Sequence, residues 1–330
     1  MLGLYLKKPG ELELREISSA MPLKEDEVKI KLIYGGICGS DLSVYRGDLP
    51  HAIYPVQPGH ELIGTIVAAG EKVQYEVGLR VVIMPNSFCG ECEFCQKGKT
   101  NICSNKESLG VNANGGFAEE FIISSKYVIP VPDVLANEKA ILIEPLSVIV
   151  HALEKVNITS ETSIAVIGCG TEGLLAIALA NYLGAQITGI DINQEKLDKV
   201  KENYRNIQVA NSEEVNEGMY DVVIEAAGVR ASFEQGVKLV KPGGTMLLIG
   251  LAREASIPVS QVVRKEISIY GSIIYNMPGD FLKSIDYLSK QDFNVEPIIS
   301  KIFHYRDYAQ AYEDACSGRY GKIVLNFKGA

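Results

Sequence analysis

The sequence predicts an α/β protein with two domains, one rich in β-strands and one built on a doubly wound parallel sheet. Three observations support this fold class. The chain has 330 residues, which is more than one ordinary domain usually contains. Short apolar runs bounded by glycine and proline dominate its first half, as in a β-rich domain with many turns. From residue 163 onward, strand-like and helix-like segments alternate, which favours a parallel sheet.

The first half is expected to contain several strands followed by a helical stretch. Residues 28–34 (VKIKLIY) alternate between polar and apolar side chains, and the apolar runs at 62–69 and 80–84 are bounded by glycine turns. The pattern changes at 139–156, where apolar residues recur at helical spacing. We therefore expect three buried strands and then a helix.

The second half predicts a repeated strand–helix unit and then a mixed tail. Further strands are expected at 163–168, 187–191, 220–228, 243–251 and 267–275. Helices are expected at 171–185 and 193–203. The tail predicts helices at 280–290 and 305–318 and a last strand at 322–327. Because no loose linker interrupts these segments, the domains are expected to abut with a cleft between them.

Composition and charge restrict the function classes. Hydrophobic residues make up 47% of the chain and charged residues 22%, as in ordinary globular proteins and unlike disordered ones. A net charge of −9 gives no general attraction to nucleic acid or anionic lipid, so neither partner is expected. No apolar run reaches the roughly 20 residues of a membrane span, and the N-terminal segment lacks the pattern of a signal peptide. These features make the cytoplasm the expected compartment.

Four of the seven cysteines form a compact cluster in the first half. Their spacing is C-x2-C-x2-C-x7-C, which fits a tetrahedral metal site in a reducing compartment, with zinc as the default metal. An iron–sulfur cluster is the alternative, but its common sequence places three residues before a fourth cysteine that proline follows. Four protein ligands leave no position for a substrate, so the zinc would be structural. The predicted ligands are Cys89, Cys92, Cys95 and Cys103.

A glycine-rich turn follows the strand predicted at 163–168. The sequence GCGTEG matches G-x-G-x-x-G and lies between a predicted strand and a predicted helix, which is the context that a dinucleotide-binding turn requires. The glycines permit a tight turn, close approach of a pyrophosphate and close packing of helix and strand, and the helix N-terminus attracts the phosphate charge. The predicted cofactor-binding residues of this Rossmann turn are Gly168, Gly170, Thr171, Glu172 and Gly173.

Asp191 ends the next predicted strand, eighteen residues after Gly173. A carboxylate at this place binds the 2′-hydroxyl of the adenosine ribose and repels a 2′-phosphate. The sequence therefore favours NAD over NADP. The alternative is a glycine-rich turn of an unrelated α/β fold in which Asp191 only caps a helix.

A second metal site is suggested by residues that lie far apart in the sequence. Cys38, His60, Glu61 and Glu144 offer a thiolate, an imidazole and carboxylates, all of which bind zinc. A catalytic zinc takes about three protein ligands and keeps an open position. Taken singly, each residue has an ordinary alternative, such as a buried cysteine or a surface carboxylate. Only the fold can bring them together.

The chain resembles the zinc-containing medium-chain dehydrogenases/reductases. CGSD, GHELIGTIVAAG, the four-cysteine segment, G-x-G-x-x-G and the C-terminal return strand occur in that family's order and cover essentially the whole chain. Glu144 followed by Pro145 makes it similar to the polyol (sorbitol-type) branch. ICGSD, LGVNANGGFAEE and IEPLSV are most similar to bacterial sugar-acid dehydrogenases of the L-galactonate and L-idonate 5-dehydrogenase type.

The resemblance implies a specific architecture. A GroES-like catalytic domain would comprise 1–148 and 277–330, with the structural zinc lobe at about 86–106. A Rossmann NAD-binding domain would be inserted at 149–276. The segment at 267–275 would be the strand through which subunits pair, so a homodimer or homotetramer is expected.

The resemblance also implies a reaction. Cys38, His60 and a glutamate would bind a catalytic zinc, so that each chain would hold two zinc ions. Either Glu61 or Glu144 can be that glutamate, and the sequence does not rank them. Zinc would acidify the hydroxyl of a secondary alcohol in a polyol or sugar acid, Ser40 would relay the proton, and the hydride would pass to NAD.

Other functions stay open at this point. L-threonine or a vicinal diol such as butanediol would be oxidised by the same chemistry. A quinone-reductase-like relative that has lost zinc is disfavoured, because this chain has both metal constellations. A non-catalytic protein that binds a partner through its zinc lobe is disfavoured by the acidic charge and the dinucleotide turn. The identity of the alcohol and the physiological direction do not follow from the sequence.

Overall fold

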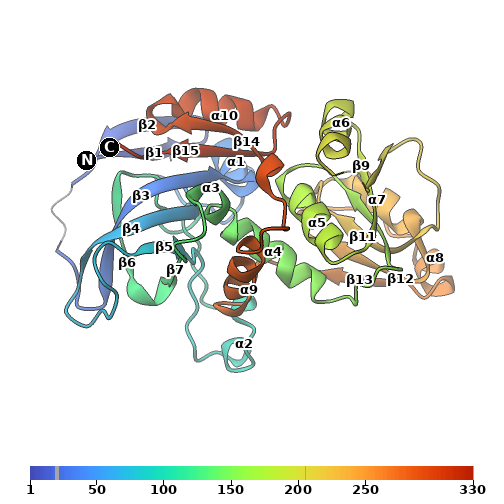
Figure 1. Ribbon diagram of the computed structural model, residues 1–330, viewed down its shortest axis with the longest axis horizontal. Helices are drawn as coiled ribbons and strands as arrows, with labels where there is room; N and C mark the ends of the chain where they lie inside the picture. The colour runs from blue at the N-terminus through green and yellow to red at the C-terminus, as the bar shows by residue number, and fades with distance from the viewer. Residues whose placement is uncertain (19–21, 205, 330) are drawn as a thin grey trace.

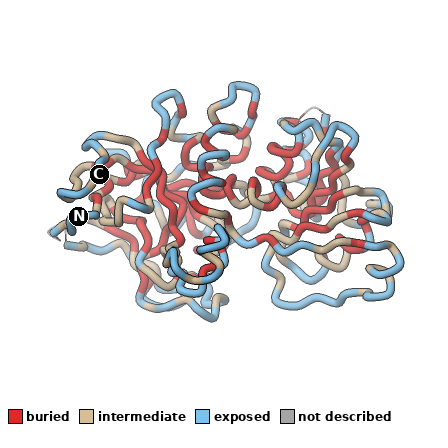
Figure 2. The backbone as a smooth tube through the Cα atoms, turned by 90° about the horizontal axis from the view of Figure 1, so that it is seen from below, coloured by how far each residue is buried: buried red, intermediate tan, exposed pale blue. Residues whose placement is uncertain are grey.

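The structure is a computed structural model and describes residues 1–18, 22–204 and 206–329. Two lobes lie side by side along the long axis of the molecule (Figure 1). The first lobe contains both labelled ends of the chain, and the second is formed by the middle of the sequence. The buried segments lie in the interior of each lobe, and exposed segments lie around its periphery (Figure 2). Among the described residues, no helix combines the length and hydrophobicity needed to cross a membrane.

The first lobe is built on a mostly antiparallel sheet. Its strand order is β14–β15–β3–β4–β5–β7, with β6 paired to the other end of β3. A separate hairpin joins β1 and β2. The strands are β1 (Leu2–Lys8), β2 (Glu11–Glu16), β3 (Glu27–Ile37), β4 (Glu61–Ala69), β5 (Arg80–Ile83), β6 (Glu120–Ser124), β7 (Val128–Pro130), β14 (Ile299–His304) and β15 (Lys322–Asn326).

Strand β3 shows why this sheet forms where it does. Its residues alternate between buried and partly exposed along EVKIKLIY and then become fully buried over its last residues. Such alternation places one face on a hydrophobic core, which fixes the register of the strand. Because β15 pairs antiparallel with β3, the C-terminal part of the chain closes the sheet that the N-terminal part begins. Helix α1 (Gly39–Arg46) follows β3 after a single residue.

The second lobe is a doubly wound parallel sheet. Its strand order is β10–β9–β8–β11–β12–β13, and every neighbouring pair is parallel. The order reverses direction at β8, and ligands of such sheets bind at the carboxyl ends of the strands beside this switch. The strands are β8 (Ser163–Ile167), β9 (Gln186–Asp191), β10 (Gln208–Asn211), β11 (Tyr220–Glu225), β12 (Val240–Leu248) and β13 (Ser268–Gly271). The helices are α5 (Thr171–Tyr182), α6 (Gln194–Asn203), α7 (Arg230–Leu239) and α8 (Val259–Arg264).

Helices α4 (Ile143–Leu153) and α9 (Gly279–Leu288) lie between the lobes (Figure 1). Helix α4 packs against α9, against α5 of the second lobe and against β4 and β5 of the first. It is buried on nearly every side, which explains why its sequence is apolar almost throughout. The domain boundary predicted after residue 148 falls inside α4. The remaining helices are α2 (Glu93–Gln96), α3 (Asn137–Ala140) and α10 (Tyr308–Cys316), and 3-10 turns lie at Thr100–Ile102, Ser125–Tyr127, Glu296–Ile298 and Tyr305–Asp307.

One predicted strand is much shorter than expected. The sequence predicts a strand over 267–275, whereas β13 ends at Gly271. The chain leaves the sheet there, and Ile274 adopts a positive φ of 39°. Tyr275 then turns inward and is fully buried. Of the large side chains at the end of this segment, Tyr275 is buried and Ile273 is 38% exposed, so the run does not reflect sheet pairing.

Candidate active site

The four-cysteine segment projects from the first lobe around the short helix α2 (Figure 1). The Sγ atoms of Cys89, Cys92, Cys95 and Cys103 lie within 4.8 Å of one another. The distance from Cys103 Sγ to Cys89 Sγ is 3.6 Å, and that from Cys103 Sγ to Cys92 Sγ is 4.0 Å. These distances are far too long for disulfides. They fit the separation of about 3.8 Å that four sulfurs have when each lies about 2.3 Å from a tetrahedral zinc.

Backbone amides favour the anionic form of Cys89 and Cys92, whereas burial raises the pKa of Cys95 to about 12. The N–H of Cys95 donates to Cys92 Sγ at 3.5 Å, and the N–H of Cys92 donates to Cys89 Sγ at 3.4 Å. Such donors favour a thiolate over a thiol, and they lower the pKa of Cys92 to about 6. The donor set and its geometry therefore fit a closed structural zinc site.

A second cluster combines Cys38, His60 and Glu61. One candidate ligand atom from each residue lies within 4.8 Å of the others. Cys38 caps the N-terminus of α1 directly after β3, and Glu61 begins β4. The antiparallel register pairs Gly36 with Glu61, which brings the end of one strand to the start of the other. A thiol, an imidazole and a carboxylate in this arrangement fit a zinc site that leaves an open position.

Asp41 contacts both Cys38 and His60 of this cluster. Its Oδ2 accepts a hydrogen bond from the backbone N–H of Cys38 at 2.9 Å, and its Oδ1 accepts one from Gly59 at 3.3 Å. The same Oδ1 lies 3.3 Å from His60 Nδ1, although that nitrogen makes no hydrogen bond among the described residues. Burial opposes a charge on His60, but Asp41 and Cys38 raise its pKa well above the usual value. Asp41 thus orients two members of the cluster at once.

Glu61 is held by a lysine from the far end of the sequence. Lys322 Nζ lies 2.5 Å from Glu61 Oε1, and both side chains are inaccessible to solvent. The other carboxylate oxygen, Oε2, is buried and has no partner among the described residues. A Cβ at Gly36 would lie 2.0 Å from that oxygen, so only glycine leaves room for it. An orphaned carboxylate oxygen beside a thiol and an imidazole is what a metal ligand without its metal would be.

Ser40 and Glu144 lie near this cluster in different roles. Ser40 Oγ is 3.2 Å from His60 Nε2. Glu144 is not within the three-residue ligand group, and its Oε1 accepts a hydrogen bond from the Tyr275 hydroxyl at 2.7 Å. Asn86 donates in turn to the Tyr275 oxygen at 2.8 Å. Burial raises the pKa of Glu144 to about 7. The geometry therefore groups Glu61 with Cys38 and His60 and holds Glu144 beside them.

The glycine-rich turn joins β8 to α5 at the switch point of the parallel sheet. Gly168 adopts a φ of +96°, which favours glycine. A Cβ at Gly173 would lie 1.7 Å from the carbonyl oxygen of Gly168, whereas one at Gly170 would meet nothing within 4 Å. The turn is therefore tight on its inner side and open on the side of Gly170. This shape fits a pyrophosphate at the N-terminus of α5.

Asp191 ends β9 beside this turn. Its Oδ2 accepts a hydrogen bond from the N–H of Cys169 at 2.7 Å, and its Oδ1 accepts one from Asn193 at 2.9 Å. Lys196 Nζ lies 3.9 Å from Oδ2. Carboxylate oxygens keep further acceptor positions when they bind backbone amides. Asp191 is therefore placed to accept ribose hydroxyls, with one cation close by.

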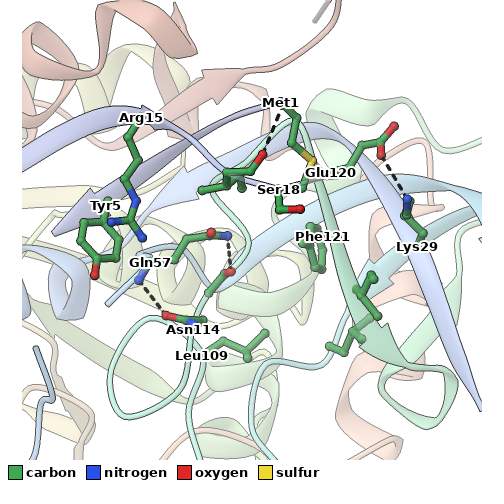
Figure 3. A pocket seen from close by; sticks show the side chains of 14 residues that line it. Met1, Tyr5, Arg15, Ser18, Lys29, Gln57, Leu109, Asn114, Glu120 and Phe121 are labelled. Atoms are coloured by element: carbon green, nitrogen blue, oxygen red, sulfur yellow. Dashed lines mark hydrogen bonds and ion pairs between the residues drawn. The ribbon is translucent and has the colours of Figure 1, made fainter. Parts of the chain in front are cut away.

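A cavity of about 280 Å³ in the first domain is distinct from this site (Figure 3). Its polar side chains are engaged with one another: Lys29 pairs with Glu120 at 3.8 Å, and the Arg15 guanidinium stacks 3.0 Å from the Tyr5 ring centroid. Among the residues that the structure describes, its lining includes neither cysteine nor histidine. We therefore place the chemistry at the Cys38 cluster and not in this cavity.

Three supporting residues were not predicted from the sequence: Asp41, Tyr275 and Lys322. Asp41 belongs to the CGSD motif, which was the one signal that could have identified it. Lys322 and Tyr275 act across 261 and 131 residues from their carboxylate partners, and no local pattern marks them.

A closed four-thiol site, a thiol–imidazole–carboxylate cluster and a dinucleotide turn on one chain define a zinc-type, dinucleotide-dependent oxidoreductase. Comparison with known families identifies the branch. Residues 24–133 match the alcohol dehydrogenase GroES-like domain, and residues 173–290 match the zinc-binding dehydrogenase domain. The chain belongs to the zinc-type alcohol dehydrogenase family, which confirms the predicted fold class and the predicted dehydrogenase class.

Curated relatives match over nearly the whole chain. D-arabinitol dehydrogenase 1 of Uromyces fabae is 32% identical, over 98% of this chain and 97% of its own length. Sorbitol dehydrogenase of Halalkalibacterium halodurans is 32% identical, over 96% of both chains. L-threonine 3-dehydrogenase of Chromobacterium violaceum is 28% identical, over 98% of both.

Solved structures agree in fold. A short chain alcohol dehydrogenase from Escherichia coli CFT073, complexed with NADH, superposes with a TM-score of 0.91 at 29% identity and covers 99% of both chains. Galactitol-1-phosphate dehydrogenase from Escherichia coli gives a TM-score of 0.91 at 29% identity, over 99% of this chain and 100% of that one. A zinc-binding dehydrogenase from Sinorhizobium meliloti 1021, bound to NADP, gives 0.90 at 26% identity and covers 98% of both.

Proposed function

We propose that this protein is a zinc- and NAD-dependent dehydrogenase that interconverts a secondary alcohol of a polyol or sugar acid and the corresponding ketone. The observation that carries the proposal is the cluster of Cys38, His60 and Glu61, which lies on the same chain as a dinucleotide turn. The names of the arabinitol and sorbitol dehydrogenases support the polyol class.

The proposed protein holds two zinc ions per chain, one for each cluster of candidate ligands. Cys89, Cys92, Cys95 and Cys103 would hold the structural ion. Cys38, His60 and Glu61 would hold the catalytic one, and Glu144 would stand beside them as the carboxylate that can exchange with Glu61. Bound there, zinc supplies Lewis acidity that makes an alcohol proton easier to remove.

The residues of the chain then have separate tasks. Ser40 Oγ would relay the proton, accepting that of the substrate hydroxyl while its own hydroxyl proton passes on to solvent, and its position 3.2 Å from His60 Nε2 puts it at the cluster. Asp41 keeps His60 and the Cys38 backbone in place, and Lys322 keeps Glu61 oriented. The nicotinamide, when bound, accepts the hydride.

The proposal includes a preference for NAD over NADP. The buried carboxylate of Asp191 would accept the ribose 2′-hydroxyl and repel a 2′-phosphate. Lys196 acts in the opposite direction, but its ammonium already lies 3.9 Å from that carboxylate.

A panel of substrates tests the proposal. We expect NADH absorbance to rise when the zinc-loaded protein receives NAD and a polyol or an aldonate, and to rise far less with NADP. His60→Ala should abolish turnover, whereas His304→Ala, at an exposed position of β14, should leave it unchanged. Turnover of L-threonine or butanediol alone would replace the proposed substrate class, and turnover with NADP alone would overturn the assignment of Asp191. No turnover with any alcohol would overturn the proposed function.

We also propose a homodimer or homotetramer. Strand β13 forms one edge of the parallel sheet, and Tyr270 on it is 46% exposed. An uncovered edge strand is a template for pairing with a second copy. Native mass spectrometry should give a mass of at least two chains, and a monomer at micromolar concentration would contradict this assembly.

A further inference from the structure

Glu172 lies in the glycine-rich turn, and its carboxyl is buried where that of a residue at a helix start is usually solvated. It is the second residue of α5, where glutamate usually points to solvent and interacts with the helix dipole. The residue keeps part of its surface accessible, yet its Oε2 is fully buried and has no hydrogen-bond partner among the described residues. A buried carboxyl oxygen without a hydrogen-bond partner costs folding free energy unless a ligand supplies that partner.

The charged groups with the largest effects on this carboxyl belong to the Cys38–His60–Glu61 cluster or lie beside it. Lys322 acts most strongly, followed by Glu61, Glu144 and His60. Burial is the largest effect and disfavours a negative charge on Glu172. Glu61 and Glu144 disfavour that charge further, whereas Lys322 and His60 favour it. Together these effects raise the pKa of Glu172 to about 8.

Packing explains why a residue of the dinucleotide turn faces the other domain. The first turn of α5 lies against the start of β15, because Leu174 Cδ1 would be 3.3 Å from a Cβ at Gly321. Strand β15 in turn pairs Ile323 with Ile37, the residue before Cys38. The turn is thereby fixed directly beside the cluster.

Lys322 does not neutralise Glu172. Its ammonium is 2.5 Å from Glu61 Oε1, and no ion pair within 4.0 Å joins it to Glu172 among the described residues. The carboxyl of Glu172 therefore lacks a cation of its own. A ligand that carries a positive charge could therefore form an ion pair with the Glu172 carboxyl.

Hydride transfer specifies where such a ligand must lie. In the proposed function, the pyrophosphate of the cofactor would bind at the turn, and the reacting carbon of the alcohol would lie at the cluster. The nicotinamide half has to span the distance between them, since its C4 must contact that carbon. Glu172 belongs to the turn and faces the cluster, so it lies next to the region that the nicotinamide half would occupy. The oxidised nicotinamide ring carries a positive charge, whereas the reduced ring carries none.

We propose that the carboxylate of Glu172 is an electrostatic partner of the oxidised nicotinamide ring, so that it strengthens the binding of NAD⁺ relative to NADH. This inference rests on the proposed function, because it requires a nicotinamide cofactor at this turn. It assigns to Glu172 a task beyond forming the phosphate-binding turn: the residue discriminates between the two redox states of the cofactor.

The test measures the binding of both cofactor forms to the zinc-loaded protein, without substrate. NAD⁺ is titrated by calorimetry and NADH by its fluorescence, at pH 9, where the carboxyl is ionised. Glu172→Gln keeps the shape of the side chain and removes its charge. In this variant we expect NAD⁺ to bind about tenfold more weakly and NADH to bind within twofold of wild type. The difference between the binding free energies of the two cofactor forms should thus change by about 1.4 kcal/mol. Glu172→Leu should show the same loss of discrimination.

Glu161→Gln is the matched control. Glu161 is exposed just before β8, at the opposite end of that strand from the turn, and its substitution makes the same change in net charge. It should leave both affinities unchanged. Thermal melting and zinc content of each variant show whether it is folded and loaded.

The outcomes separate the two proposals. Equal weakening of NAD⁺ and NADH in Glu172→Gln would make Glu172 a structural part of the turn and overturn this inference alone. An unchanged ratio of the two affinities would also overturn it. A wild-type protein that binds neither NAD⁺ nor NADH would overturn the proposed function itself.

Discussion

Lys322 and Glu61 form a fully buried ion pair that joins strand β15 to the first residue of β4. The pair lies directly beside Cys38 and His60, so the C-terminal strand contributes to the candidate zinc site although it supplies no ligand. A buried pair gains attraction in a medium of low polarity but has lost the hydration of both charges. Removal of one partner therefore leaves the other charge buried and uncompensated.

Substitution of Lys322 by methionine should destabilise the protein strongly. In the zinc-free protein we expect a loss of about 3–5 kcal/mol in the free energy of unfolding, because the Glu61 carboxylate would remain buried without a cation. Lys301→Met is the control, since Lys301 pairs with Asp314 on a partly exposed surface and such a pair contributes at most about 1 kcal/mol. Urea unfolding measures both. Equal losses in the two variants would show that burial of the Glu61 pair is unimportant.

Removal of one thiol from the four-cysteine lobe should remove one zinc ion. Cys103→Ser deletes a ligand of the closed site, so the content should fall from two zinc ions per chain, one for each cluster, to about one. The melting temperature should also fall, because metal binding is coupled to the folding of such a lobe. Cys316→Ser, at an exposed cysteine outside both clusters, should change neither quantity. Elemental analysis decides; a full zinc content in Cys103→Ser would contradict the assignment.

Asp191→Asn should weaken the binding of NAD by about tenfold or more. The change removes the charge from a carboxylate that we expect to accept the ribose hydroxyl, and hydrogen bonds to charged groups contribute about 1.5–3 kcal/mol. The preference for NAD over NADP should narrow at the same time, since the repulsion of a 2′-phosphate is lost. Asp198→Asn, exposed on α6, serves as the control. If kcat/KM with NAD matched wild type, Asp191 would be only a support for the backbone of the turn.

Tyr275→Phe should lower kcat by about 10- to 100-fold, because it removes a hydrogen bond of about 1.5–3 kcal/mol to a buried carboxylate. The affected group is Glu144, which Tyr275 holds at 2.7 Å. The phenylalanine keeps the edge-to-face contact with Phe281, so the packing should persist. The affinity for NAD should not change. Tyr270→Phe on the exposed face of β13 is the control. A rise in KM with an unchanged kcat would argue against a positioning role.

The stability of the protein should depend on pH through Glu172. The folded state raises its pKa from 4.5 to about 8. Between these pH values the folded protein keeps a proton that the unfolded chain has released. The contribution of the protonated carboxyl to the free energy of unfolding is therefore complete below pH 4.5 and is lost as the pH rises to about 8. The effect is about 1.4 kcal/mol for each pH unit of that window.

Comparison with Glu172→Gln isolates this effect, because Lys322, Glu61, Glu144 and His60 are common to both proteins. The stability of wild type relative to the variant should fall steadily from pH 5 to pH 8 and then become constant. A difference that is independent of pH, in denaturant unfolding at each pH, would show that the carboxyl is not buried in solution.

Local patterns predicted most elements of the fold. The alternation along 28–34 predicted β3, because a period of two residues is set by which face meets the core. The strand-then-helix order from residue 163 predicted α5, whose residues are apolar and buried over most of its length. The segment at 267–275 was predicted too long for a reason of the same kind. Its last residues leave the sheet, with Tyr275 buried and Ile273 exposed, and sequence alone does not distinguish such a run from a strand.

The candidate site divides in the same way. The cysteine spacing and the glycine turn are local, so their residues could be predicted directly. The grouping of Glu61 with Cys38 and His60, and the position of Glu144 behind Tyr275, depend on strand register and on the packing of α4. The direction of the Glu172 side chain depends on how the two lobes meet, which no segment of the sequence encodes alone.

The closure of the first sheet by β15 has a consequence for the order of folding during synthesis. All strands of the parallel sheet lie between Ser163 and Gly271, so that domain can form once this stretch has emerged from the ribosome. The sheet that carries Cys38 and Glu61 has to wait for residues 299–326. Until then Glu61 lacks its cation and the end of β3, Tyr34–Ile37, lacks β15 beside it. The nascent catalytic half therefore exposes an unpaired strand edge that chaperones would have to shield.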